Sequence, residues 1–233
     1  MTEPRRATAP PAAVALAPAA ADQRREQMLR AALTVISERG YAETRIADVA
    51  ERAGVSPALV IYYFKTKDQL LTDAVRYYDD SWYAVGQRRM AALPTAALRL
   101  EEIVAMSCLP DEDPEPRNSG QLWLDLWAQA ARNTAVALVR RNSDERWRQI
   151  ITSLVLAGQD EGEFRGVDPA RFAVSLTALL DGLTIQIALG DPAVDPAGAF
   201  ELSMQFVAGE LGFAWTPGRG SADGTPAVPQ KGR

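Results

Sequence analysis

The sequence predicts an all-α protein in which a small N-terminal three-helix domain is joined by a long helix to a larger helical body. Three observations support this fold class. Hydrophobic residues make up 47% of the 233 residues, and they recur three and four positions apart, which is the spacing of one helix face. Glycines and Asp-Pro or Ser-Pro pairs stand where these segments stop and start. Alternating runs of β-branched residues, which favour strands, are few.

The first three helices are predicted to form the N-terminal domain. They are expected at residues 22–39, 44–53 and 57–64. Thr44 is expected to cap the second helix and Ser56 the third, because a side-chain oxygen at this position accepts a free backbone amide hydrogen. The second and third helices are short and are separated by a tight turn at residues 53–55. Such a pair is a helix-turn-helix.

A long helix is predicted to follow Thr66, which stands in capping-box spacing with Gln69, and to reach about Met90. Beyond it an acidic, proline-broken loop is expected at residues 110–119. The remaining helices are expected at residues 95–108, 121–132, 135–162, 168–189 and 195–211. The last two begin at Asp-Pro pairs, which are good capping pairs. The chain after Thr66 is therefore expected to be a helical body.

This pattern divides the chain into two domains and two tails. Residues 22–66 form the helix-turn-helix domain and residues 67–215 the body. Residues 1–21, rich in Ala and Pro, and residues 216–233, rich in Gly and Pro, are expected to be disordered. A secretory signal is the alternative for the first segment, but its prolines interrupt the apolar core that such a signal requires.

The composition argues against catalysis and against a bound cofactor. The chain contains no histidine and one cysteine, Cys108. An internal disulfide, histidine-based catalysis and the usual zinc and iron–sulfur sites are therefore excluded. No apolar run reaches the roughly 18 to 20 residues of a membrane span. We expect a cytoplasmic protein that is not an enzyme and that needs no metal.

Charge is distributed unevenly along the chain, whose net charge is −5. Residues 22–67 hold eight Lys and Arg against six Asp and Glu, a net charge of +2. Residues 68–215 hold twelve against twenty-two, a net charge of −10. A mildly basic N-terminal domain on an acidic body fits a nucleic-acid partner at the N-terminal end.

The helix-turn-helix indicates where double-stranded DNA would bind, because this motif places its second helix in the major groove. Polar contacts, mostly to phosphates, are expected from Ser56, Tyr62, Tyr63, Lys65 and Lys67. Contacts to base edges and thymine methyl groups are expected from Pro57, Ala58 and Leu59. Val60 and Phe64 are expected to pack the small core instead.

Three motifs of this domain closely resemble the N-terminal signature of the TetR (tetracycline-repressor) family. They are TRIADVA at residues 44–50, AGVS at residues 53–56 and YYFKTKDQL at residues 62–70. The resemblance adds Thr44 and Arg45 to the DNA-binding candidates and implies a phosphate contact for Lys67. The family usually has a tyrosine where this chain has Ile61, so either Tyr62 and Tyr63 supply that contact or DNA binding is somewhat weaker.

The body is similar to the C-terminal domain of the BetI-type branch of this family. The similarity rests on LWLDLW at residues 122–127, Trp147, GQ at residues 158–159, GEF at residues 162–164 and LLDGL at residues 179–183. It implies a homodimer that represses transcription from a palindromic operator and releases the DNA when a small-molecule effector binds the body. The effector, the operator and the regulated genes do not follow from the resemblance.

A cavity for that effector needs an apolar lining and a few polar groups. The candidates are Trp82, Met106, Cys108, Trp123, Asp125, Trp127, Phe172 and Asp181. Asp125 and Asp181 stand in apolar segments, where an unpaired carboxylate is costly unless an arginine or a ligand offsets it. A carboxylate beside a tryptophan would favour a cationic ligand.

The last two helices carry more apolar residues than one buried face requires. The resemblance implies that they form a four-helix dimer interface, for which the candidates are Leu176, Leu179, Leu183, Ile187, Phe200, Met204, Val207 and Leu211. A twofold dimer would present two recognition helices to a palindrome.

Three other functions fit parts of the sequence. A helix-turn-helix protein that ignores small molecules, including an activator, would be favoured by a fully packed body without a cavity. An all-α enzyme would need Asp125 and Asp181 to meet in one cleft. A helical module that binds a protein partner would lack specific DNA binding.

Overall fold

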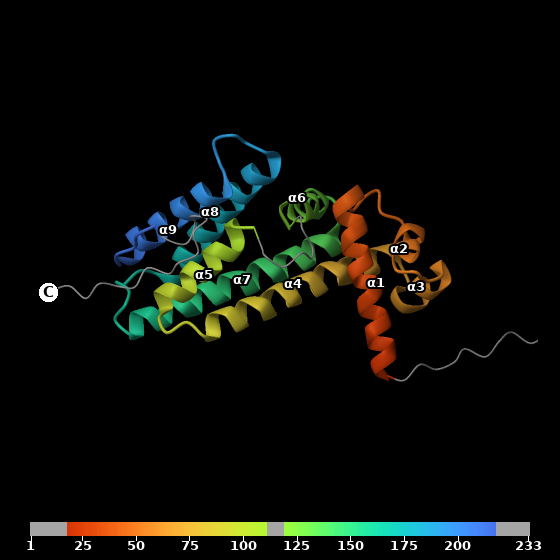
Figure 1. The fold of residues 1–233 in the computed structure, drawn as a ribbon, viewed down its shortest axis with the longest axis horizontal. Helices are drawn as coiled ribbons and strands as arrows, with labels where there is room; N and C mark the ends of the chain where they lie inside the picture. The colour runs from red at the N-terminus through yellow and green to blue at the C-terminus, as the bar shows by residue number, and fades with distance from the viewer. Residues whose placement is uncertain (1–17, 111–118, 218–233) are drawn as a thin grey trace, which may run out of the picture.

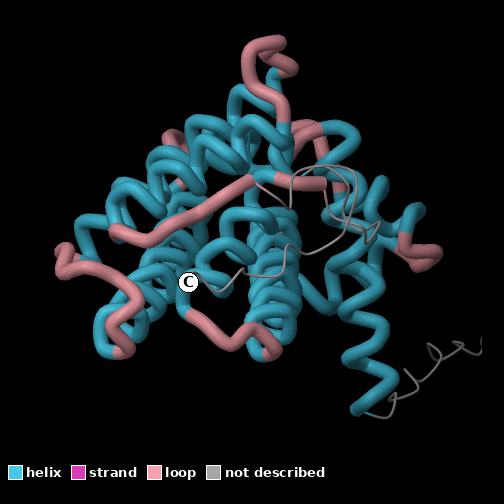
Figure 2. The backbone as a smooth tube through the Cα atoms, turned by 60° about the vertical axis from the view of Figure 1, so that its left-hand side comes forward, coloured by secondary structure: helices cyan, strands magenta, loops and turns pink. Residues whose placement is uncertain are grey.

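The computed structural model describes residues 18–110 and 119–217, and every regular element in this part of the chain is a helix (Figures 1 and 2). The helices are α1 (Pro18–Arg39), α2 (Ile46–Arg52), α3 (Pro57–Phe64), α4 (Lys67–Ala91), α5 (Ala96–Cys108), α6 (Ser119–Ala130), α7 (Thr134–Asp160), α8 (Pro169–Leu189) and α9 (Pro196–Leu211). The all-α prediction is confirmed.

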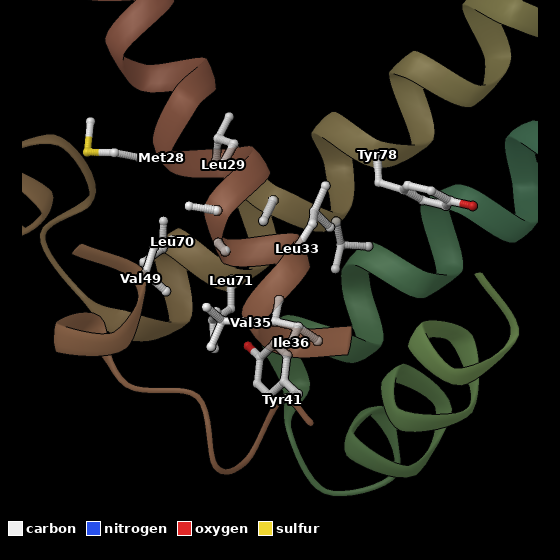
Figure 3. Packing of buried hydrophobic residues seen from close by; sticks show 14 of the residues in the cluster. Met28, Leu29, Leu33, Val35, Ile36, Tyr41, Val49, Leu70, Leu71 and Tyr78 are labelled. Atoms are coloured by element: carbon white, nitrogen blue, oxygen red, sulfur yellow. The ribbon is translucent and has the colours of Figure 1, made fainter. Parts of the chain in front are cut away.

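Helices α1 to α3 form a unit at one end of the molecule, called the head below (Figure 1). Their apolar side chains share one buried cluster with the start of α4 and with side chains from α6 and α7. Figure 3 shows part of this cluster, where Leu33, Val49 and Leu71 from three different helices lie between the ribbons. The head therefore packs directly on the body.

The remaining helices form the body, and α4 and α7 are its longest members. A second buried cluster joins α5, α7, α8 and α9. By length and composition α8 could cross a membrane, but core helices of soluble proteins pass the same test. Here α8 packs against α5, α6, α7 and α9, so we assign it to the core of the body.

Most of the predicted helix ends are found, because polar side chains satisfy the free backbone amides there. The Oγ atoms of Ser56 and Thr66 accept the amides of Leu59 and Gln69, at 3.3 Å and 3.1 Å. Carboxylates cap the last two helices, where Asp168 and Asp195 precede the prolines.

Two predictions about helix starts are wrong. The cap position of α2 is Arg45 and not Thr44, whose hydroxyl instead donates to the carbonyl oxygen of Gly40 at 2.7 Å. In addition, α1 begins at Pro18, four residues before the expected start, because the first turn of a helix tolerates proline and the next three residues are alanine. Residues 18–21 are therefore helical, and the rest of the predicted N-terminal tail lies outside the described residues.

Candidate nucleic-acid interface and ligand cavity

Helices α2 and α3 form the helix-turn-helix of the head. Gly54 makes the turn between them with a positive φ of 62°, a backbone conformation that side chains with a Cβ rarely adopt. Val60 and Phe64 are 0% and 1% exposed, so one face of α3 packs into the head. Ile61 and Tyr62 project from the opposite face with 47% and 70% of their surfaces exposed. The outward face of α3 is therefore free to meet DNA.

The outward face of α3 is mostly apolar. Exposed Pro57 and Ala58 continue it toward the N-terminal end of the helix. Among the side chains of this face, Tyr62 has the hydroxyl that can reach a phosphate or a base edge. Tyr63 is half-buried against the apolar cluster of the head, and its ring meets the edge of Tyr62 at a centroid distance of 5.6 Å.

Two lysines lie beside this face, as the sequence predicts. Lys65 follows α3 with a positive φ of 62°, and its Nζ donates to the carbonyl oxygen of Tyr62 at 2.6 Å. The Nζ of Lys67 donates to the carbonyl oxygen of Ala42 at 2.7 Å, which ties the start of α4 to the turn after α1. Both ammonium groups are thus held near the edges of the helix-turn-helix.

Of the two candidates at the start of α2, only one is accessible. Arg45 is exposed, but Thr44 is 1% exposed and its hydroxyl is already bonded inside the head. Including Thr44 among the DNA contacts is therefore a wrong prediction, because its side chain faces the interior. Its bond to Gly40 instead shapes the turn that leads into α2.

The body contains a cavity of about 130 Å³, open on one side, that helices α4 to α8 line. Of the predicted lining residues, Trp82, Met106, Trp123, Trp127 and Asp181 line it. It is also lined by Tyr78, Asp79, Tyr83, Ser107, Ser143, Asp144, Trp147, Thr177, Leu180 and Thr184. A volume of this size suits a compact ligand of a few heavy atoms.

Three predicted lining residues lie elsewhere. Cys108 is buried in the second apolar cluster, where burial raises its thiol pKa to about 11. Phe172 belongs to the same cluster and stacks on Phe206 with a centroid distance of 5.9 Å. The Asp125 carboxylate accepts a hydrogen bond from the backbone amide of Tyr41 in the head. Helix packing turns all three away from the cavity.

Aromatic rings form much of the cavity wall. The rings of Trp82 and Trp147 meet edge to face with centroids 5.4 Å apart, and Trp82 makes a similar contact with Tyr83 at 5.2 Å. Trp127 holds the guanidinium of Arg140 5.6 Å from its ring centroid. These ring faces carry partial negative charge that attracts cations.

Three carboxylates add negative charge to the wall. Burial raises the pKa of Asp79 to about 6, although Ser143 Oγ donates a hydrogen bond to its carboxylate. Burial also raises the pKa of Asp181 to about 6, and the nearby charge of Asp144 contributes. Arg140 forms an ion pair with Asp144 at 3.2 Å. Among the described residues, Asp79 and Asp181 form no ion pair within 4.0 Å.

Asp79 lines the cavity but was not among the residues predicted to do so, although the sequence contains a signal for it. It stands on α4 four residues after Val75 and three before Trp82, which places it on the apolar face of that helix. The same reasoning that selected Asp125 and Asp181, a carboxylate within an apolar segment, applies to this position. No group of His, Cys, Asp and Glu side chains suited to a metal ion occurs among residues 18–110 and 119–217.

The predicted dimer contacts are mostly inside a single chain. Leu176, Phe200, Met204, Val207 and Leu211 are all 0% exposed, and Leu183 is 8% exposed. Leu179 and Ile187 are partly buried against the same cluster. Six of the eight predicted positions therefore pack the body of one chain, because they lie on the most apolar stripe of each helix, and a dimer contact of Leu179 and Ile187 stays a prediction. The large apolar residues exposed on α8 and α9 are Val174, Leu189 and Leu202.

Both halves of the chain match known protein families. Residues 28–74 match bacterial regulatory proteins of the tetR family, and residues 96–212 match the C-terminal domain of BetI-type transcriptional repressors. The HTH-type transcriptional regulator BetI of Burkholderia ambifaria is 33% identical over 79% of this chain and 92% of its own length. The BetI regulator of Escherichia coli is 31% identical over 81% and 94%.

Solved structures show the same fold. A regulator from Saccharomonospora viridis in complex with choline has a TM-score of 0.72 and 28% identity, over 80% of this chain and 96% of that one. A TetR-family regulator from Rhodococcus has a TM-score of 0.73 and 28% identity, over 82% and 99%. These relatives are transcriptional regulators and not enzymes.

Proposed function

Since this chain belongs to the TetR family of transcriptional regulators, with a BetI-type C-terminal domain, we propose that it is a homodimeric repressor released from its operator by a small organic cation. Its place of action would be the cytoplasm, where regulators of this family normally work. Outward-facing α3 would read the operator, and the cavity of the body would hold the effector.

The composition of the cavity wall carries this proposal. Tryptophan and tyrosine faces surround a space that Asp79, Asp144 and Asp181 make negative. Asp144 is paired with Arg140, but burial makes the ionised forms of Asp79 and Asp181 costly, and a cation between aromatic faces offsets that cost. The related regulator from Saccharomonospora viridis was solved with choline, a quaternary ammonium compound, which supports a ligand of this class.

A ligand-independent DNA-binding protein is the alternative function. A body packed without a cavity would favour it, and the described body has a cavity lined by polar and aromatic groups. An enzyme that uses Asp125 and Asp181 as a catalytic pair is disfavoured, because the two carboxylates do not meet. Asp125 accepts a hydrogen bond from the Tyr41 amide of the head, whereas Asp181 lines the cavity.

Exposed apolar residues on α8 and α9 support the homodimer. Val174, Leu189 and Leu202 are 57%, 72% and 49% exposed in a single chain. These two helices pack against each other, and their exposed apolar side chains are ones that a second chain would cover in the proposed dimer. A twofold axis between these helices would place two heads on a palindromic operator.

Selection of bound DNA from a random duplex pool, at stated and near-physiological salt, tests the regulator function. We expect a palindrome to be enriched by the dimer, and we expect Tyr62→Ala to weaken binding to it about tenfold or more, a loss typical of one removed DNA contact. Tyr62 is a better site for this test than Lys67. Its side chain is exposed, whereas a change of Lys67 would also break the hydrogen bond from Lys67 to the Ala42 carbonyl oxygen.

Leu138→Ala is the matched control for this experiment. Leu138 is 50% exposed on α7 in the body, so its loss should leave operator affinity unchanged. A folded, dimeric sample that enriches no sequence would refute the regulator function and would leave a protein-interaction module as the leading account.

Ile61 is expected to recognise thymine by an apolar contact with the methyl group of that base. It is an exposed apolar side chain on the face of α3 that would enter the major groove, where thymine presents its methyl group. Replacing a contacted thymine by uracil removes only that methyl and should weaken binding about fourfold. The Ile61→Ala variant should be indifferent to that replacement. If Ile61→Ala remains as sensitive as the unchanged protein at every operator thymine, this reading of Ile61 is wrong.

A further inference from the structure

Helix α6 lies beside α1 of the head (Figure 1), and its side chains also line the cavity. Leu122 and Leu126, one turn apart, are 3% and 2% exposed and belong to the apolar cluster of the head. Trp123 and Trp127, the residues that follow them, line the cavity. One short helix therefore contributes to the wall of the ligand cavity and to the core of the head.

Asp125 extends this connection to the backbone of the head. Its carboxylate accepts the amide hydrogen of Tyr41, which lies just beyond the end of α1 (Figure 3). Gly40 precedes Tyr41 with a positive φ of 82°, and a Cβ built there would lie 3.5 Å from Asp125 Oδ2. The carboxylate therefore lies in van der Waals range of the turn, and the positive φ is what favours glycine at this position.

The turn that Asp125 holds is itself tied to the start of α2. The carbonyl oxygen of Gly40 accepts both the amide and the hydroxyl of Thr44, at 3.2 Å and 2.7 Å. Tyr41 is 4% exposed, so the turn is anchored in the core of the head. A displacement of this turn would consequently move the first helix of the helix-turn-helix.

We propose that Asp125 is a positioning residue that couples occupation of the cavity to the orientation of the head. Asp125 lies two residues from each cavity tryptophan on the same helix, so a cation that repositions Trp123 and Trp127 also moves the carboxylate. A hydrogen bond weakens steeply when its geometry changes, so the bond to Tyr41 is strong in only one position of α6. This inference rests on the proposed function, and it names the residue through which ligand binding would release the protein from DNA.

Coupling is measured as the ratio of operator affinities without and with saturating choline, in the full-length dimer. For the unchanged protein we expect a ratio of about 5 to 150, the usual range of allosteric coupling. Asp125→Ala should bind choline as tightly as the unchanged protein or more tightly, read from tryptophan fluorescence, because no bond to Tyr41 has to break, while its ratio falls toward one. Asp125→Asn keeps an oxygen acceptor for the Tyr41 amide and should retain most of the coupling.

Glu38→Ala is the matched control. Glu38 is an exposed carboxylate of the head that pairs with Arg52 inside the head, so its removal should leave the ratio unchanged. Hydrogen exchange at the Tyr41 amide gives a second measurement that needs no variant. The amide should be protected in the free protein and should exchange faster with choline bound.

The possible results are distinguishable. Full coupling in Asp125→Ala, or Tyr41 protection that choline does not change, would overturn the role of Asp125 and leave the repressor function intact. Loss of choline affinity in Asp125→Ala would show that Asp125 belongs to the cavity, which also overturns the proposal. If the unchanged protein fails to bind choline, or fails to bind an operator, the proposed function fails and this inference fails with it.

Discussion

Lowering the pH from about 7.5 to about 5 is expected to weaken choline binding about 10- to 100-fold. Asp79 and Asp181 have pKa values raised to about 6, mainly by burial, so both lose most of their negative charge over this interval. A bound cation favours the ionised carboxylates, and affinity therefore falls as the pH falls through about 6 and levels off above about 7. Titration calorimetry at a series of pH values measures the effect.

The neutral carbon isostere of choline is the control ligand, in which a quaternary carbon replaces the nitrogen. It fills the same volume without charge, so its affinity should not fall as the carboxylates are protonated. An equal pH dependence for both ligands would contradict the electrostatic account of the cavity. Choline affinity that stays constant across this interval would contradict it as well.

Asp181→Asn should separate binding from stability. A raised pKa in the folded state means that the carboxyl contributes stability at low pH that is lost as the pH rises through about 6. At neutral pH the variant should therefore unfold at a higher temperature without ligand and bind choline more weakly, about tenfold. A variant that loses choline affinity and thermal stability together would instead indicate a disturbed fold.

The largest expected effect on stability is that of Gly158→Ala, which should lower the free energy of unfolding by about 3 kcal/mol. A Cβ at this position of α7 would lie 2.2 Å from Cδ2 and 2.3 Å from Cε2 of Phe164. The ring cannot withdraw easily, because Phe164 is 6% exposed, packs on Phe213 and donates its amide to the Gly158 carbonyl oxygen at 3.0 Å. Chemical denaturation at a fixed chain concentration checks the value.

Gly166→Ala is the matched control, in the loop that follows α7. A Cβ there would meet nothing within 4 Å, and its φ lies outside the left-handed region. The change should be neutral or stabilise the chain by a few tenths of a kcal/mol, through the entropy of the unfolded state. Equal stability of the two variants would refute the close packing of Phe164 against α7.

Local signals predicted the helices well, because capping and apolar spacing act within a few residues of the chain. Ser56, Thr66, Asp168 and Asp195 each stand beside the free amides that they satisfy. The start of α2 was misplaced because the Thr44 side chain can either cap the helix or bond to the preceding turn. Only the folded turn shows that its hydroxyl donates to the carbonyl oxygen of Gly40.

The helix-turn-helix and the outward position of Tyr62 were also determined by the sequence alone, whereas Thr44 and Tyr63, two other predicted contacts, are buried and half-buried. The turn at Gly54 and the inward positions Val60 and Phe64 leave Ile61 and Tyr62 on the outer face of α3 by helical spacing. Such a motif is contained within about twenty residues, so no distant contact is needed to predict it.

What lines the cavity was decided by tertiary structure. Asp125 and Asp181 look alike in the sequence, since each is a carboxylate within an apolar segment, yet Asp181 lines the cavity and Asp125 bonds Tyr41. The apolar stripes of α8 and α9 were likewise expected at a dimer interface, and Leu176 and Phe200 lie in the core of one chain. Helical periodicity tells which residues share a face, whereas the partner of that face depends on how helices distant in the sequence pack.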